Sequence, residues 1–280
     1  MKTRRQGLLL LLPCAIALLL LFALPQVLMF EASLGRRSAY GGIVHDWGLL
    51  NYARALEPLY LKILARSLWL AFATTALSLL VGYPVAYWIA VRAPVRFRSA
   101  LLVLVILPFW TSFLVRMYAW IFVLRSEGLL NLSLEAVGLP RLGLLYNDFA
   151  VMLGQLYGEL PFMILPLYAS LEKLDRSLLE AAADLGARPR ETLWRVTVPL
   201  TLPGIVAGSV LVFIPSLGAF LAPDLLGGAR TVYVGNLIQS QFAIARDMPF
   251  GAALSFLLSL LVLLLLFLFR KPMRAAQVGR

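Results

Sequence analysis

Long apolar stretches separated by short polar segments are the main feature of this chain. Each stretch approaches or exceeds the roughly 20 residues that an α-helix needs to cross a bilayer core of about 30 Å. The stretches cover about residues 7–29, 64–91, 99–124, 148–170, 202–222 and 250–269. The sequence lacks the short alternating segments of an outer-membrane β-barrel. The pattern therefore predicts an all-α polytopic membrane protein with six transmembrane helices.

Composition supports this class and excludes several kinds of function. Apolar residues make up 61% of the 280 residues and charged residues 14%, whereas a soluble domain carries about 25% charged residues. The single cysteine, Cys14, permits no internal disulfide, and the single histidine, His45, is expected to be a solvated loop residue. No GxxxxGK[ST] sequence is present, so we expect neither ATP hydrolysis nor a bound cofactor on this chain, which is not expected to be an enzyme.

The first apolar stretch has two interpretations. Its basic start at Lys2, Arg4 and Arg5 is also typical of a cleaved signal peptide. The stretch is longer than the apolar part of a usual signal peptide, and no small-x-small cleavage site follows it. We therefore favour a retained first helix, followed by a polar outer loop with a short surface helix near residues 51–57.

Basic residues are distributed unequally between the two sides of the predicted helices. Fifteen lysines and arginines lie on the side that holds both termini, and eight lie on the other side. Because cytoplasmic loops carry the excess of basic residues, both termini are expected in the cytoplasm of a bacterial inner (plasma) membrane. The net charge of +11 is scattered over separate segments, which argues against a nucleic-acid partner.

Prolines inside the predicted helices indicate kinks. A proline removes a backbone hydrogen bond, and a broken helix at membrane depth is tolerated where it faces protein or a water-filled cavity. These prolines are Pro84, Pro108, Pro161, Pro166 and Pro215. They favour a transport path over a passive anchor, although ordinary helix bending explains them equally well.

Two charged residues lie deep in the predicted helices. Charges inside a membrane are costly and are commonly functional, and these are Arg116 and Glu159. Their depths differ by about 10 Å at the rise of an α-helix, a gap that helix tilt could close. Two alternatives are open: a structural ion pair between Arg116 and Glu159, or a Glu159 side chain that faces the path and meets a cationic substrate.

The longest polar insert on the side of the termini is EAAADLGARPRETLWRVTVP, residues 180–199. The alanine-rich start favours a helix. Gly186 can adopt a positive φ and end that helix, and Pro189 is tolerated in the first turn of a second helix. The insert is therefore predicted to form a helix-break-helix knob outside the membrane, which a soluble partner could bind.

This insert resembles the "EAA" loop of ABC importer permeases. The matching positions are Glu180, Ala181, Ala182, Gly186, Val196, Val198 and Pro199. In that family the loop docks into a cleft on a cytoplasmic ATPase subunit. The resemblance implies that these residues, together with Arg190, contact such an ATPase, which would itself bind ATP and Mg.

Three further stretches look like the spermidine/putrescine importer permeases. They are LPFWTSFLVRMYAW (107–120), ELPFMILPLYASLEKLD (159–175), and PDLLGG with GNLIQSQF (223–242). The resemblance implies a type I ABC importer permease (MetI-like) fold. It also implies two ATPase subunits, a second homologous permease subunit and an extracytoplasmic substrate-binding protein as partners. Trp110 and Tyr118 join Arg116 and Glu159 as candidate residues of the translocation path.

We expect three parts: residues 1–60 as the first helix and outer loop, 61–270 as a permease core with the coupling loop 176–199, and 271–280 as a cytoplasmic tail. The expected function is that of the membrane-spanning permease subunit of an ATP-driven importer. A polyamine is the favoured substrate, and aminoethylphosphonate, thiosulfate and ferric iron are alternatives. A secondary transporter driven by an ion gradient is the alternative from another class, but it often has inverted repeats and would have no use for an EAA loop.

Overall fold

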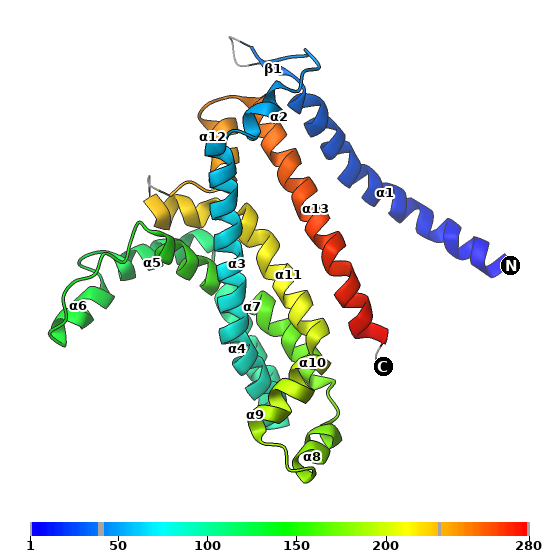
Figure 1. The fold of residues 1–280 in the computed structure, drawn as a ribbon, viewed down its shortest axis with the longest axis vertical. Coiled ribbons are helices and arrows are strands. Elements are labelled where there is room, and N and C mark those ends of the chain that lie inside the picture. The colour runs from blue at the N-terminus through cyan, green and yellow to red at the C-terminus, as the bar shows by residue number, and fades with distance from the viewer. Residues whose placement is uncertain (1, 39–41, 229–230, 279–280) are drawn as a thin grey trace. The chain divides into compact units, whose positions relative to one another are not determined.

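The computed structural model describes residues 2–38, 42–228 and 231–278, and these residues are mainly helical (Figure 1). The α-helices are α1 (Lys2–Ser33), α2 (Leu50–Ala55), α3 (Pro58–Tyr87), α4 (Val95–Ile106), α5 (Phe113–Leu124), α6 (Leu129–Ala136), α7 (Asp148–Glu172), α8 (Arg176–Asp184), α9 (Pro189–Thr192), α10 (Val198–Leu200), α11 (Leu202–Gly218), α12 (Val234–Ala243) and α13 (Met248–Val278). Other helical turns are the π-helical η1 (Trp88–Arg92), η3 (Leu193–Thr197) and η4 (Pro223–Gly227), and the 3₁₀ turn η2 (Leu107–Trp110). Two short strands, β1 (Arg36–Arg37) and β2 (Ile43–Val44), pair antiparallel.

The helices account for the predicted membrane spans. Four segments are long and apolar enough to cross a membrane: Leu12–Ser33, Pro58–Arg92, Asp148–Glu172 and Met248–Phe267. Two helix pairs pass the same test but are bent, by 87° between Val95–Trp110 and Phe113–Ala136 and by 69° between Pro189–Leu200 and Leu202–Gly218. The expected six spans are reached when each bent pair counts as one span.

The predicted span over residues 99–124 is divided into two helices close to Pro108, one of the prolines at which a kink was expected. The helical path stops after η2, and Thr111 and Ser112 have extended backbones with ψ of 149° and 135°. The Thr111 hydroxyl donates a hydrogen bond of 2.7 Å to the carbonyl of Pro108. This side chain thus takes a carbonyl that a continuing helix would use, as short polar side chains commonly do. By contrast, Pro84, Pro161, Pro166 and Pro215 lie inside continuous helices.

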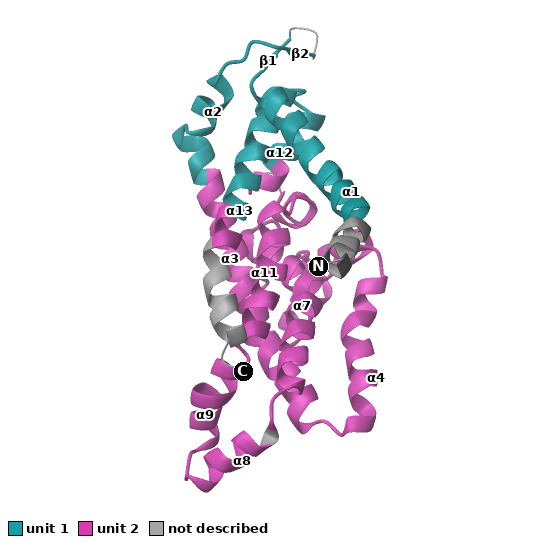
Figure 2. Cartoon of the chain, turned by 90° about the vertical axis from the view of Figure 1, so that its right-hand side faces the viewer, with its two compact units in different colours: residues 1–62, 237–263 teal, residues 63–236, 264–280 magenta. Residues whose placement is uncertain are grey.

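The chain forms two compact units, which Figure 2 shows in different colours. Unit 1 contains Met1–Lys62 and Leu237–Leu263, and unit 2 contains Ile63–Asn236 and Leu264–Arg280. Each unit has hydrophobic clusters of its own among the described residues.

In unit 1, a cation and aromatic rings hold α2 and α13 together. The Arg54 guanidinium donates to Asp247 at 2.8 Å and lies 3.9 Å from the centroid of the Phe250 ring. Tyr60 meets Phe250 edge to face at 4.9 Å between ring centroids. The Asn51 side chain donates to the carbonyls of Ser33 and Gly35, at 2.8 Å each, so α2 also caps the end of α1.

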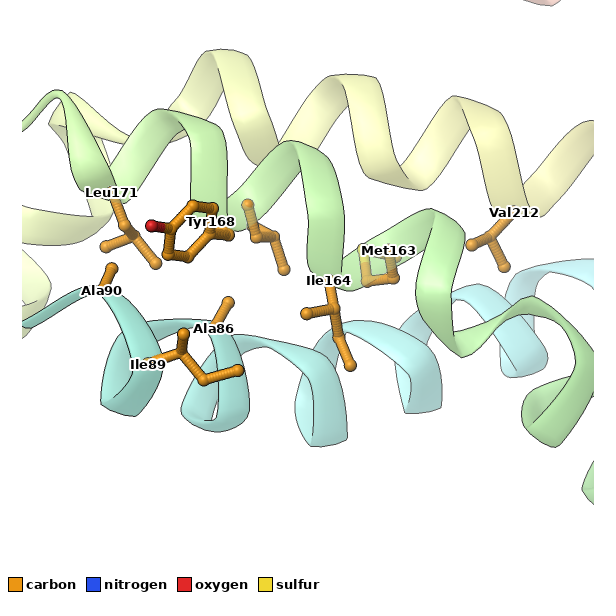
Figure 3. Packing of buried hydrophobic residues seen from close by; sticks show 9 residues of the cluster. Ala86, Ile89, Ala90, Met163, Ile164, Tyr168, Leu171 and Val212 are labelled. Atoms are coloured by element: carbon orange, nitrogen blue, oxygen red, sulfur yellow. The ribbon is translucent and has the colours of Figure 1, made fainter. Parts of the chain in front are cut away.

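The core of unit 2 lies between α3, α7 and α11. Figure 3 shows the small side chains of Ala86 in α3 and Ala90 in η1 facing the larger Tyr168 and Leu171 of α7. Val212 of α11 completes the same cluster. Small residues on one side let the helix backbones approach closely, which is how membrane helices gain packing contacts without a hydrophobic driving force.

A polar cluster fixes the beginning of α7 in unit 2. Asp148 accepts hydrogen bonds from Arg66 at 2.5 Å and from the Tyr233 hydroxyl at 2.6 Å. Burial, and next the hydrogen bond to Asp148, raise the pKa of the Tyr233 hydroxyl. Tyr233 therefore remains a hydrogen-bond donor at any physiological pH and ties the segment before α12 to α7.

Candidate functional site

The coupling segment, residues 176–200, lies between α7 and α11 in the chain. Its first helix, α8, begins after Asp175, whose carboxylate accepts a hydrogen bond of 3.0 Å from the backbone N–H of Ser177. The helix ends at Asp184, and Gly186, two residues later, has a φ of +80°. The N–H of Gly186 bonds to the carbonyl of Ala183 at 2.9 Å, and the N–H of Ala187 bonds to that of Ala182 at 3.0 Å. This is a Schellman motif, in which a glycine takes the left-handed position, so the predicted break at Gly186 is confirmed.

The second helix of the segment begins at Pro189, as predicted. The Glu191 carboxylate accepts a hydrogen bond of 2.9 Å from the backbone N–H of Arg188 and thus satisfies a free donor at the helix start. The helix continues through η3 and α10 to the bend before α11. In Figures 1 and 2, α8 and α9 lie at the end of unit 2, beyond α7 and α11.

Most of the predicted contact residues lie on the surface of this segment. Glu180, Ala181, Gly186, Arg190 and Pro199 are exposed, whereas Ala182 and Val198 are partly buried. Two large apolar side chains that the predicted set omitted are also exposed: Leu185 at 89% and Trp194 at 68%. The signal in the sequence was their apolar character within an otherwise polar insert. An exposed apolar pair among charged residues is typical of a surface that a partner covers.

Two glycines of α11, the helix that follows the coupling segment, pack closely against α7. A Cβ at Gly204 would lie 2.5 Å from the Cβ of Ser170 and 2.7 Å from the carbonyl oxygen of Pro166. A Cβ at Gly208 would lie 2.8 Å from Sδ of Met163. Gly204 meets the later residues of α7 and Gly208 the earlier Met163, so α11 packs antiparallel to α7. The coupling segment therefore joins two helices whose backbones lie in close contact.

The intramembrane charges do not pair with each other. Glu159 on α7 is 9% exposed and accepts a hydrogen bond from the Ser216 hydroxyl on α11. Arg116 on α5 is 7% exposed, and its guanidinium carbon lies 5.6 Å and 5.4 Å from the ring centroids of Phe109 and Phe113. The ion pair that the sequence left open is thus absent among the described residues.

Phe113 gives the physical reason for the missing pair. A Cβ at Gly158, the neighbour of Glu159, would lie 3.0 Å from Cε2 of Phe113. The ring that stacks on the guanidinium of Arg116 therefore also packs against α7 beside Glu159. Trp110 and Tyr118, the other two path candidates, are 79% and 49% exposed.

Comparisons with known proteins identify the family. Residues 82–271 match the family described as "Binding-protein-dependent transport system inner membrane component". The chain is 42% identical over 260 residues to the spermidine/putrescine transport system permease protein PotB of Salmonella typhimurium, covering 92% of this chain and 90% of that protein. It is 41% identical over 260 residues to PotB of Escherichia coli K12, covering 92% and 94%.

Solved structures have the same fold at low sequence identity. A chain of a bacterial ABC transporter involved in the import of the acidic polysaccharide alginate superposes with a TM-score of 0.71 at 19% identity, covering 98% of this chain and 97% of that chain. A chain of the MetNI methionine ABC transporter superposes with a TM-score of 0.55 at 21% identity, covering 79% and 98%. The expected MetI-like fold is therefore confirmed, and this multi-pass protein belongs to the family of binding-protein-dependent transport system inner membrane components.

Proposed function

We propose that the chain is the membrane-spanning permease subunit of an ATP-driven polyamine importer. The coupling segment carries this proposal, because it presents exposed Leu185 and Trp194 on a rigidly capped pair of short helices. A secondary transporter would need no such surface. The named relatives are spermidine/putrescine permease proteins over 92% of this chain, which supports a polyamine over the other solutes considered.

The coupling segment would transmit the motion of the ATPase. Glu180, Arg190 and the exposed apolar pair would contact the cytoplasmic ATPase, which binds ATP and Mg. Because α7 and α11 pack backbone to backbone at Gly204 and Gly208, a pull on α8 and α9 would move both helices together. Closure of the two ATPase subunits would thereby open the path outward, and their separation would open it inward.

The remaining partners follow from the same importer architecture. A second homologous permease would form the other half of the path, and an extracytoplasmic binding protein would deliver the substrate to the outer loops, chiefly residues 31–60 and 223–249. One of the structural neighbours is an alginate transporter in complex with a periplasmic protein, an arrangement of the kind proposed here. Both termini and the coupling segment would face the cytoplasm, as the excess of basic residues on that side favours.

Purification with partners tests the proposed assembly. We expect the tagged chain, extracted from its native membrane in mild detergent, to bring with it an ABC ATPase and a second permease. Proteoliposomes that contain this complex and the binding protein should accumulate radiolabelled spermidine only with ATP. A chain that purifies alone and transports under an ion gradient without ATP would refute the importer. If the complex imported thiosulfate, aminoethylphosphonate or ferric iron in place of spermidine, only the assignment of a polyamine as the substrate would be refuted.

Glu159 is the residue proposed to meet the cationic substrate. Its carboxylate has a hydroxyl partner but no cationic partner among the described side chains. We expect Glu159→Gln to leave the complex assembled and to lower spermidine uptake by about tenfold or more, equivalent to at least about 1.4 kcal/mol of lost interaction.

A matched loop variant controls for charge removal. Glu135 is an exposed glutamate that pairs with Arg141 at 2.9 Å. Glu135→Gln removes the same charge outside the bundle and should leave uptake unchanged. Uptake by Glu159→Gln at the wild-type rate would remove Glu159 from the path.

A further inference from the structure

Three buried polar atoms of the described chain have no hydrogen-bond partner: Ser78 Oγ, Arg116 Nε and Gln155 Nε2. The residues that carry them are 0%, 7% and 2% exposed. Burying a polar group without a partner is unfavourable, and the hydrocarbon of a bilayer offers it no substitute partner. All three atoms belong to unit 2.

Two contacts show which residues of α3 lie level with which residues of α7. The Thr74 hydroxyl donates to Oε1 of Gln155 at 3.2 Å. Eight residues further along both helices, a Cβ at Gly82 would lie 3.1 Å from Cγ of Met163. The two helices thus run parallel here, and Ser78, midway between Thr74 and Gly82, lies level with Glu159.

Two other contacts show which residues of α5 lie level with which residues of α7. A Cβ at Gly158 would lie 3.0 Å from the Phe113 ring, and a Cβ at Gly154 would lie 3.2 Å from Sδ of Met117. The order is reversed between the helices, so α5 runs antiparallel to α7. Arg116 immediately precedes Met117 and therefore lies level with Gln155. The residues that carry the three unpartnered atoms are thus level with the turn of α7 that holds Gln155 and Glu159.

The chemistry of the atoms selects the ligand. Arg116 Nε–H can only donate, whereas the serine hydroxyl can donate or accept. The free atom of the Gln155 amide donates as placed, and it would accept if the amide were turned over. A cation cannot accept the hydrogen bond that Arg116 Nε–H offers, and an anion there is disfavoured by the Glu159 carboxylate one helical turn away. Water can accept from the donors and donate to the acceptors in either amide orientation, and buried waters usually have about three polar partners.

We propose that a buried water molecule is bound among Arg116, Gln155 and Ser78. Such a water would satisfy the three polar atoms without fixing α5 to α7 as firmly as a direct salt bridge. This inference concerns the unit 2 bundle and does not depend on the identity of the substrate.

A density map of the purified importer complex, at a resolution that shows ordered waters, tests the site directly. We expect a peak within hydrogen-bond distance of both Arg116 Nε and the Gln155 amide. A map that shows ordered waters elsewhere in the bundle but none here would overturn the proposal.

A double-mutant cycle tests whether the partners share one ligand. We expect Ser78→Ala and Gln155→Met each to lower the apparent unfolding temperature of the complex, Ser78→Ala by roughly 2–4 °C. The double variant should lose less than the sum, because removal of one partner already releases the water. If the site were dry, Ser78→Ala would remove an unpaired polar atom and leave the temperature unchanged or higher.

Two controls accompany the double-mutant cycle: a serine variant elsewhere in the chain, and replacement of chloride in the buffer. The Ser255 hydroxyl donates to the carbonyl of Gly251 in its own helix at 2.9 Å, so Ser255→Ala should show no coupling to Gln155→Met. Additive effects of Ser78→Ala and Gln155→Met would overturn the shared water. Coupling that disappears when chloride is replaced by gluconate would assign the site to chloride and also overturn it.

Discussion

Gly186→Val is expected to abolish the coupling between ATP hydrolysis and substrate import while the complex still assembles. Gly186 has a φ of +80°, and a Cβ there would meet nothing within 4 Å. The cost is therefore backbone strain alone, on the order of 1–3 kcal/mol for a β-branched residue in the left-handed region. The strain is relieved by breaking the two hydrogen bonds that end α8, which changes the angle between α8 and α9. We expect spermidine uptake to fall by about tenfold or more, the factor that 1.4 kcal/mol represents.

Gly138 offers a control with the same backbone conformation. It too has a φ of +80°, and a Cβ added there would also meet nothing within 4 Å, but it follows α6, far along the chain from the coupling segment. Gly138→Val should leave uptake and ATPase stimulation by the loaded binding protein unchanged. Gly186→Asn should retain much of the activity, because asparagine tolerates the left-handed region. Normal stimulation of the ATPase in Gly186→Val would contradict the proposed role of this break.

Gly204→Ala is expected to destabilise the bundle markedly. The added methyl group would meet the carbonyl oxygen of Pro166 at 2.7 Å, and this backbone atom cannot move aside as a flexible side chain could. Overpacking of this kind costs about 2 kcal/mol. The apparent unfolding temperature should fall by roughly 4–8 °C in a thermal unfolding experiment on the detergent-solubilised complex.

The last residue of the same helix provides the comparison. A Cβ at Gly218 would meet nothing within 4 Å, so Gly218→Ala should leave the unfolding temperature almost unchanged. An equal effect of the two substitutions would show that helix propensity, and not the contact between α7 and α11, decides the outcome.

The local conformation of the coupling segment could be predicted from the sequence. The positive φ of Gly186 and the helix start at Pro189 depend on residues within a few positions along the chain. Steric limits on φ and the missing N–H of proline act over this short range. The alanine-rich stretch alone placed the start of α8 too late, because the helix begins at Arg176, where the Asp175 side chain caps it.

The partners of the buried charges could not be predicted in this way. Arg116 and Glu159 both stand out as charges in apolar stretches, but their depths alone allowed a direct pair. The Phe113 ring that packs against both Arg116 and α7 begins α5, directly after a bend of 87° in the chain. The periodicity of apolar residues along the sequence does not predict the angle of that bend.

The sequence by itself determined the class of this protein, its apolar spans and the form of the coupling segment, because hydrophobic length, helix propensity and the backbone limits of glycine and proline are local properties. Only the tertiary structure decided which helices pack through Gly204 and Gly208, that Glu159 bonds to Ser216, and that Arg54 bonds to Asp247. These contacts join residues that are tens to hundreds of positions apart. Their free energies exist only once the helices are packed, so no local pattern in the chain encodes them.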